Sequence, residues 1–204
     1  KGVFIVEEEE TALKLINDLF TGNVDGISSS LIVIEEFLKG EEASFICLVS
    51  GDSIVPLASS KDHKKLNNGD TGPNTGGMGA YSPTSLIDEK LANKVIKEII
   101  KPTLYELKKR GIFYSGFLYA GLMIDKNKNP YVLEYNCRLG DPEAQAILMR
   151  LESDIVELFL STVDNELEKI KIRWSEYASC TVVLASEGYP GKYKKNIKIE
   201  GLEH

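Results

Sequence analysis

The chain has few of the side chains that zinc centres and covalent catalysts use. Its 204 residues include two histidines and three cysteines, with no Cys-x-x-Cys spacing, so a zinc site is not expected. No Ser-His-Asp or Cys-His set is legible, which makes nucleophilic catalysis a poor hypothesis. Cys47, Cys137 and Cys180 each lie in an apolar strand-like run. This predicts buried free thiols in a reducing compartment, and hence a cytoplasmic protein.

Long apolar runs and excess positive charge are also missing. Without a run of about 18 apolar residues, no transmembrane helix and no membrane partner are expected. The net charge of −7 argues against a nucleic-acid surface, because phosphate backbones bind clustered Lys and Arg. Small anionic ligands remain compatible with this charge, since they need only a local positive site. With 43% hydrophobic and 27% charged residues, the composition is typical of a globular protein, which we expect to be a monomer.

Both ends of the sequence suggest a larger protein. Residue 1 is Lys rather than Met, and "KGVFIV" predicts a strand at 2–6 that would need a partner. The final "GLEH" fits either a natural sequence or the beginning of a purification tag. We therefore expect this chain to be part of a longer protein.

Hydrophobic spacing predicts a mixture of helices and strands in the first half of the chain. "EEETALKLINDLF" has a helical apolar stripe and should end near Gly22, and a buried strand should cover 31–34. Residues 41–60, "EEASFICLVSGDSIVPLASS", should form a hairpin with Gly51-Asp52 at its turn. Ser85 should cap the helix "SLIDEKLANKVIKEII", and Pro102 should kink it or divide it from a second helix that stops at Gly111.

The second half continues the mixture. "FYSGFLYAGLMID" and "PYVLEYNCR" should be strands joined by "KNKN". Asp141 should cap a helix with Pro142 at its first position, and "ASCTVVLASE" should be a further strand. Strict βαβ alternation is lacking, which predicts an α+β fold with largely antiparallel sheets.

The strand "YVLEYNCR" carries an unusual row of polar side chains. A period of two places Val132, Glu134, Asn136 and Arg138 on one face and the apolar residues on the other. Carboxylate and amide oxygens suit Mg²⁺, which completes its shell with water and nucleotide phosphates, and Arg138 could hold a phosphate or carboxylate. A helix start directly after it would add an anion site. The alternative is the polar face of a half-exposed strand.

Two further segments fit a nucleotide site. In "IVIEEFLKGEEAS", backbone groups from Glu35 to Leu38 could pair with adenine and Glu42 could accept a ribose hydroxyl; the alternative is an edge strand with an acidic turn. In "SSKDHKKLNNGDTGPNTGGMGAYSP", successive glycine amides could converge on an anion as a nest, beside three lysines; the alternative is a mobile linker. The segment is not a Walker A loop, because it contains no Gly-Lys-Ser/Thr. Phosphoryl transfer is the chemistry that these sites could support, because it needs positioning and charge rather than a protein nucleophile.

These segments, together with "GFLYAGLMID" and "EYNCRLGDPEAQ", resemble the phosphoribosylamine–glycine ligase (glycinamide ribonucleotide synthetase) family of ATP-grasp enzymes. The resemblance runs from Lys1 to about Gly201, and "EGYPGKY" resembles the start of the family's C-terminal domain. It implies that ATP phosphorylates glycine and that 5-phosphoribosylamine then attacks the acyl phosphate, giving glycinamide ribonucleotide, ADP and phosphate. It also implies an ATP-grasp core with a lid remnant at 1–37, a nucleotide and metal subdomain at 38–175, and the start of a C-terminal domain at 176–204.

The resemblance assigns roles to particular residues. Glu134 and Asn136 would hold Mg²⁺ or Mn²⁺, while Lys64 and Arg138 would steady the phosphoryl group and the acyl phosphate. Adenine would lie against Glu35, Phe37 and Leu38, and the ribose against Glu42. The remaining candidates for the phosphoribosylamine and glycine side are Asp62, Asn74, Thr75, Gly76, Gly77, Met78, Gly79 and Asp141.

Two departures from the family pattern limit these expectations. Leu122 stands where many ATP-grasp enzymes have a second metal-binding acid, which puts a two-metal site in doubt. The family's N-terminal domain is absent, so the chain alone should be inactive. Two rival hypotheses stay open: another ATP-grasp ligase with a different acid and amine, and a nucleotide-binding module without catalysis.

Overall fold

The computed structural model describes residues 3–24, 27 and 29–202, which form two compact units, 1–39 and 40–204. The first unit holds helix α1 (Glu9–Thr21), which ends where Gly22 adopts φ +74° and donates its N–H to the Asp18 carbonyl. The helix prediction is confirmed. The predicted strands at 2–6 and 31–34 are wrong within the described residues, which form no strand there; Gly2 lies outside them. Val33 and Ile34 are exposed, so an apolar run alone did not produce a buried strand.

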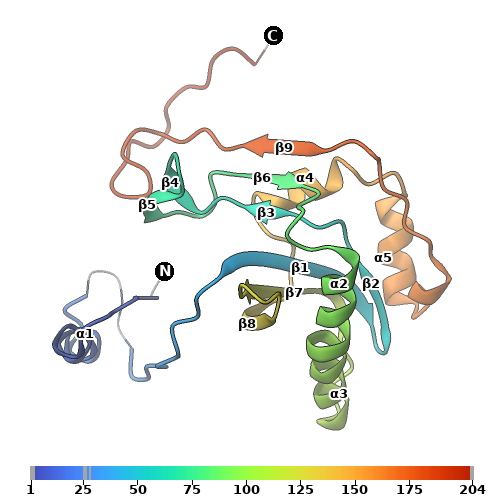
Figure 1. Cartoon of the computed structure of the whole chain (residues 1–204). Helices are drawn as coiled ribbons and strands as arrows, with labels where there is room; N and C mark the ends of the chain where they lie inside the picture. Colours follow the sequence, from blue (N-terminus) through green and yellow to red (C-terminus); the bar gives the residue numbers. More distant parts are fainter. Residues whose placement is uncertain (1–2, 25–26, 28, 203–204) are drawn as a thin grey trace. The chain divides into compact units, whose positions relative to one another are not determined.

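The second unit is built on a four-stranded antiparallel sheet in the order β2-β1-β7-β8 (Figure 1). Its strands are β1 (Glu41–Ser50), β2 (Ser53–Pro56), β7 (Ser115–Ile124) and β8 (Pro130–Asn136). Gly51 turns the first hairpin with φ +58°, as its sequence predicts. The sheet leaves β8 at an edge, with most of its side chains exposed.

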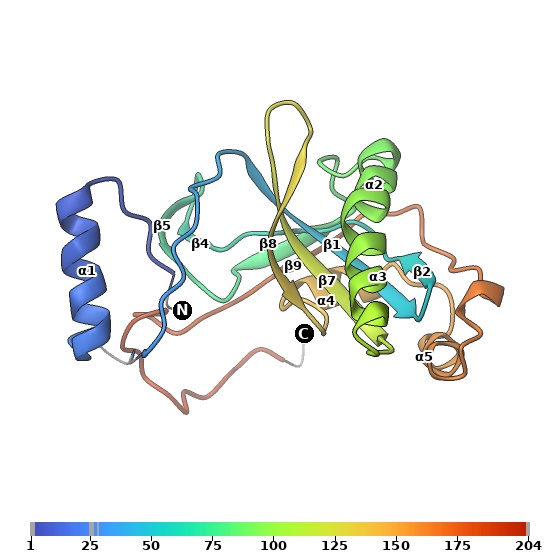
Figure 2. The ribbon, with the colours of Figure 1, turned by 90° about the horizontal axis from the view of Figure 1, so that it is seen from below.

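One face of this sheet is covered by α2 (Glu89–Val95), a π-helical turn η1 (Ile96–Ile100) and α3 (Lys101–Lys109) (Figure 2). The predicted stripe of Leu91, Val95 and Ile99 is buried there. It packs against alternate residues of β1 and β7 in the main core: Ala43, Phe45, Cys47, Val49, Leu118, Ala120, Leu122 and Ile124.

Two details of this helix differ from the sequence prediction. Asp88, not Ser85, is the N-cap: its Oδ1 accepts from the Leu91 N–H at 2.7 Å, and the preceding Leu86 and Ile87 are buried. Pro102 does not divide the helix, because the π turn precedes α3 without a gap; the alternative, a kink at Pro102, stays a prediction. The missing proline N–H therefore changes the helix type without interrupting the helix.

The other face of the sheet carries a second layer (Figure 1). The polar stretch 59–83, for which the sequence offered an anion nest or a mobile linker, contains four short strands: β3 (Lys61–Asp62), β4 (Lys65–Asn67), β5 (Thr71–Asn74) and β6 (Gly79–Ser82). Strand β6 pairs with both β3 and β9 (Ser179–Val182), which confirms the last predicted strand. Helices α4 (Glu143–Leu148) and α5 (Ile155–Val163) and the 3₁₀ turn η2 (Leu167–Lys169) complete the layer.

The start of α4 also differs from its prediction. Pro142 is the N-cap, and the Asp141 side chain does not cap the helix but accepts from the Gln145 side chain at 3.2 Å. The helix is short, and its first residue, Glu143, is a buried carboxylate. The predicted anion site at this helix start therefore already contains a negative side chain.

The cysteine prediction is only partly correct. Cys47 is buried in the main core, and burial raises the pKa of its thiol to about 12. Cys137 and Cys180 are free thiols but exposed. Both lie on edge strands or just beyond one, where an apolar sequence run does not guarantee burial. Among the described residues, no helix is long and apolar enough to span a membrane.

Candidate active site

A β-bulge decides which side chains of β8 face the site. Glu134 pairs with Gly121, but Val132 pairs with the next residue, Leu122, so the register shifts by one. Paired residues of an antiparallel ladder share a face. Val132 therefore lies on the helix-covered face with Leu122, not beside Glu134 as strict alternation predicts. The strand's two faces are exchanged across the bulge.

Glu134 and Asn136 share one face of β8, as predicted, and it is the face opposite the covering helices. The Asn136 amide donates to Glu134 Oε1 at 3.1 Å, which holds the two side chains together and leaves one oxygen of each for a ligand. Leu122 is fully buried on the opposite face and adds no donor. Among the residues that the structure covers, no group of three His, Cys, Asp or Glu could hold a metal ion. A pair of hard oxygens fits Mg²⁺, which takes one or two protein groups and completes its shell with water and phosphate oxygens.

Lys64 brings positive charge to this face. Its Nζ lies 2.8 Å from Oε2 of Glu42, a residue of β1 on the same face as Gly121. Burial lowers the pKa of Lys64, but the bond to Glu42 and the charges of Asp62 and Glu134 outweigh burial and leave the pKa raised. The ammonium therefore stays charged, with Glu42 orienting it. The predicted nucleotide-site residues Glu42, Lys64 and Glu134 are thus close enough to interact.

Asp62, in the same region, has a carboxyl group whose burial is energetically unfavourable. Its Oδ1 is buried without a hydrogen-bond partner among the described residues. Burial and then the charge of Glu143 raise the pKa of Asp62 to about 7, against the opposing charge of Lys64. A buried carboxyl group whose pKa lies near neutrality, with one oxygen left without a partner, is common at functional sites.

Behind Asp62 lies a chain of buried hydrogen bonds that the sequence did not reveal. Glu143 accepts from Ser60 Oγ at 3.2 Å and from the Tyr119 hydroxyl at 3.0 Å. Tyr119 lies 2.5 Å from Ser44 Oγ. Burial and the Glu143 charge raise the pKa of Tyr119, so it remains a neutral donor. The glutamate stands in the quoted segment "DPEAQ", but only the tertiary contacts distinguish it from a surface acid.

The glycine loop, residues 74–79, does not form the predicted anion nest. Thr75 and Met78 donate their N–H groups to the Lys64 and His63 carbonyls at 2.7 and 2.8 Å. Gly77 donates to Thr75 Oγ1 at 3.0 Å, and Gly76 donates to the Tyr189 hydroxyl at 2.9 Å. Four successive amides are therefore already paired within the protein. The loop lies directly against Asp62: a Cβ on Gly77 would lie 2.8 Å from Oδ1 of Asp62.

The remaining predicted residues are more dispersed. Arg138 is exposed and donates to the Leu139 carbonyl at 2.9 Å, which leaves its other donors for an anion. Asp141 is exposed beside the loop, and its carbonyl would lie 3.1 Å from a Cβ on Gly77. Glu35, Phe37 and Leu38 belong to the first unit, in a segment without helix or strand; of these three residues, Leu38 alone is partly buried.

A family model described as "Phosphoribosylglycinamide synthetase, ATP-grasp (A) domain" matches residues 1–144, most of the chain. The chain belongs to this family. The phosphoribosylamine–glycine ligase of Vibrio vulnificus (strain YJ016) is 51% identical over 202 residues, covering 99% of this chain and 47% of that protein. The enzyme of the same name from Salmonella typhimurium is 50% identical over the same length. The chain thus spans about half the length of the curated relatives it matches.

Solved structures agree with this membership of the phosphoribosylglycinamide synthetase family. The crystal structure of the Thermotoga maritima phosphoribosylamine–glycine ligase has a TM-score of 0.80 at 37% identity, covering 95% of this chain and 48% of that one. An L-amino acid ligase from Bacillus licheniformis has a TM-score of 0.62 at 18% identity, which shows a shared fold alone. The predicted α+β ATP-grasp fold is confirmed.

Proposed function

We propose that the longer protein containing this chain is an ATP-dependent carbon–nitrogen ligase that joins glycine to 5-phosphoribosylamine. The 51% identity to phosphoribosylamine–glycine ligase over 202 residues carries this proposal. The site geometry supports it, since Glu42, Asp62, Lys64 and Glu134 meet on one face of the sheet. Such a ligase belongs to purine biosynthesis. Its reaction needs bound and oriented phosphates but no covalent intermediate on the protein.

The proposed reaction has two steps. The glycine carboxylate attacks the γ-phosphorus of ATP and releases ADP, giving glycyl phosphate. The amine of 5-phosphoribosylamine then attacks the carbonyl carbon of glycyl phosphate and expels phosphate, giving glycinamide ribonucleotide. The first step creates an activated acyl group, and the second uses it before water can.

The residues predicted from the sequence have the following roles in this proposal. Glu134 and Asn136 would hold Mg²⁺ or Mn²⁺, which neutralises phosphate charge when bound. Lys64, oriented by Glu42, would neutralise the transferring phosphoryl group, and Arg138 would steady the acyl phosphate. Glu42 would also meet the ribose, and Glu35, Phe37 and Leu38 the adenine. The loop 74–79, Asp62 and Asp141 would face glycine and phosphoribosylamine.

The wider organisation is part of the same proposal. Residues 1–37 would be part of the ATP-grasp lid, 38–175 the nucleotide and metal subdomain, and 176–204 the start of the next domain. We further propose a cytoplasmic monomer that acts on small molecules, without nucleic-acid or membrane partners. The net charge of −7 supports the absence of a nucleic-acid partner.

ADP release by the full-length protein tests the function. The assay contains Mg²⁺, ATP and freshly generated phosphoribosylamine, with and without glycine. Release that requires both glycine and phosphoribosylamine is the expected result. Release indifferent to glycine would favour an ATP-grasp ligase for another acid, to be identified with a panel of small carboxylic acids. ATP binding without any ADP release would favour a nucleotide-binding module instead.

A further inference from the structure

The C-terminal segment returns to the glycine loop. Strand β9 pairs with β6, and the Val183 N–H then donates to the Met78 carbonyl at 2.9 Å, which carries the chain along the loop. A turn follows, in which Tyr189 donates its N–H to the Ser186 carbonyl at 3.1 Å. Figure 1 shows this returning segment beside the β4–β5 hairpin. The turn therefore presents the Tyr189 side chain to the loop.

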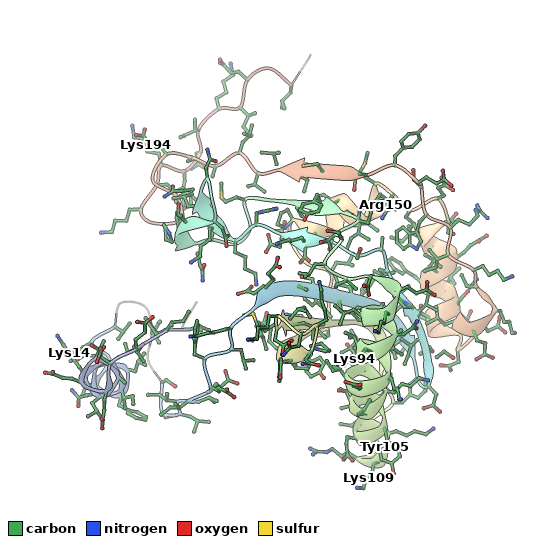
Figure 3. The ribbon with its side chains drawn as sticks, viewed as in Figure 1. Lys14, Lys94, Tyr105, Lys109, Arg150 and Lys194 are labelled. Carbon is green, nitrogen blue, oxygen red and sulfur yellow. The ribbon has the colours of Figure 1, made fainter. Side chains whose placement is uncertain are left out.

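Arg150 fastens the beginning of this segment. Its guanidinium donates to the carbonyls of Ser175 and Tyr177 at 2.8 and 2.9 Å, and to Ser82 Oγ at 3.1 Å (Figure 3). The segment is thus tied to the end of β6 before β9 begins. Fixed at Arg150 and again along β9, it can hold a side chain against the loop with little loss of entropy.

Tyr189 makes one well-defined contact with the loop. Its hydroxyl oxygen accepts from the Gly76 N–H at 2.9 Å, across 113 residues of sequence. Its ring meets the Tyr193 ring edge-on, with centroids 5.8 Å apart. The other loop amides, of Thr75, Gly77 and Met78, are bonded to the loop itself or to the short link between β3 and β4. Gly76 alone among these four depends on a side chain from the far end of the chain.

The Tyr189 hydroxyl group can still donate a hydrogen bond. A phenol can accept one hydrogen bond and donate another. Among the described residues, none accepts the Tyr189 hydroxyl proton. Gly76 beside it is exposed, so a ligand can reach this point of the loop.

The surrounding sequence favours a strongly anionic ligand. Lys192, Lys194 and Lys195 follow Tyr189 on the same segment, and Figure 3 labels Lys194 there. Lys65 lies on β4, in the hairpin that leads into the loop. A phosphate dianion gains more from such lysines than a single carboxylate does.

We propose that Tyr189 is a substrate-contacting residue, whose hydroxyl accepts from Gly76 and donates to the phosphate of the phosphorylated amine substrate. This inference rests on the proposed function, because that reaction supplies a phosphorylated amine. The contact would link the C-terminal segment to substrate binding in the loop. Loss of the hydroxyl would remove one bond to the phosphate and one bond that shapes the loop.

The test compares Tyr189→Phe with Tyr193→Phe in the full-length protein. Each variant loses one hydroxyl from the same aromatic pair, but only the Tyr189 hydroxyl bonds to the loop. Steady-state kinetics should show KM for phosphoribosylamine raised about tenfold in Tyr189→Phe, with KM for ATP and glycine unchanged. Tyr193→Phe should leave all three values unchanged. An unchanged KM for phosphoribosylamine in Tyr189→Phe, or an equal rise in both variants, would overturn the proposal.

Amide hydrogen exchange gives a readout that does not depend on turnover. Exchange in the peptide containing Gly76 should be faster in Tyr189→Phe than in the parent without any ligand, and inorganic phosphate should slow it in the parent alone. If the parent protein shows no glycine-dependent ADP release, the proposed function fails while this measurement still decides the Gly76 contact. Protection by glycine but not by phosphate would overturn the phosphate assignment.

Discussion

Asp62 lies between opposing charges, with Glu143 behind it and Lys64 near it. Its folded-state pKa of about 7 lies above the ordinary value of 3.8, so ionisation costs folding free energy. Protonated Asp62 therefore contributes to the free energy of unfolding. This contribution is complete below about pH 4 and is lost as pH rises through 7. The protein therefore tolerates a destabilising carboxylate at this position, as proteins often do at functional sites.

Replacing this carboxyl group should reveal that cost. We expect Asp62→Asn to have a higher melting temperature than the parent at pH 8 and an equal one at pH 4, because an amide does not ionise. After allowance for solvent screening, the gain at pH 8 should be on the order of 1 kcal/mol, or about 2–4 °C. Thermal unfolding followed by circular dichroism across this pH range measures it. A melting difference that is the same at both pH values would contradict the assigned cause.

Glu134 is an exposed side chain on an edge strand, which separates its function from the fold. We expect Glu134→Ala to lower glycine-dependent ADP release by at least about 100-fold, the scale for losing one preorganised electrostatic contact. The free energy of unfolding should change by less than about 0.5 kcal/mol. Glu106→Ala, an exposed glutamate on α3, is the control and should leave both quantities unchanged. Wild-type turnover in Glu134→Ala would remove this residue from the metal site.

At the scale of elements, the glycine loop needs Gly77 because neighbouring atoms lie too close to its Cα to leave room for a side chain. Gly77 has φ +120°, and a Cβ there would lie 2.3 Å from Pro142 Cδ. Gly77→Ala should destabilise the protein by about 1–3 kcal/mol through strain and this clash. Gly69→Ala is a matched control, because Gly69 also has positive φ, +72°, but an open space around its Cβ. The melting temperatures of the two variants are compared. An equal decrease in both would show that the positive φ alone, and not the clash with Pro142, destabilises Gly77→Ala.

The helix that covers the sheet should behave as a conventional core element. Ile100 is fully buried in the π turn, so Ile100→Ala should cost about 2–5 kcal/mol of the free energy of unfolding. Tyr105 points to solvent near the end of α3 (Figure 3), and Tyr105→Ala should cost less than about 0.5 kcal/mol. Denaturant unfolding measures both values. Similar losses in the two variants would contradict the packing described for this helix.

At the scale of the whole molecule, the two units carry very different amounts of core. The described part of the second unit, 40–202, holds three buried hydrophobic clusters, whereas Leu19 is the buried hydrophobic residue described in 1–39. A protein lacking residues 1–39 should therefore keep a cooperative thermal transition within about 2–4 °C of the parent. Calorimetry of both forms tests this. A non-cooperative melt of the shortened protein would show that the second unit depends on the first.

Sequence patterns located most elements of the second unit correctly. The hairpin at Gly51, the stripe of α2, the two long strands and the pair Glu134–Asn136 were all predictable, because periodicity and turn chemistry act over a few neighbouring residues. The errors fall where distant contacts decide. The apolar run at 31–34 forms no strand. The N-cap of α2 is Asp88 rather than Ser85, because Leu86 and Ile87 between them are buried.

The sequence by itself determined the α+β class, the family and the residue types of the candidate site. Tertiary structure alone decided which faces and atoms meet. The bulge opposite Gly121 moved Val132 to the other face, the loop amides were paired instead of left open, and Glu143 was buried beside Asp62. These outcomes depend on pairing register, on hydrogen bonds between distant segments and on burial, none of which is encoded in any short window of sequence.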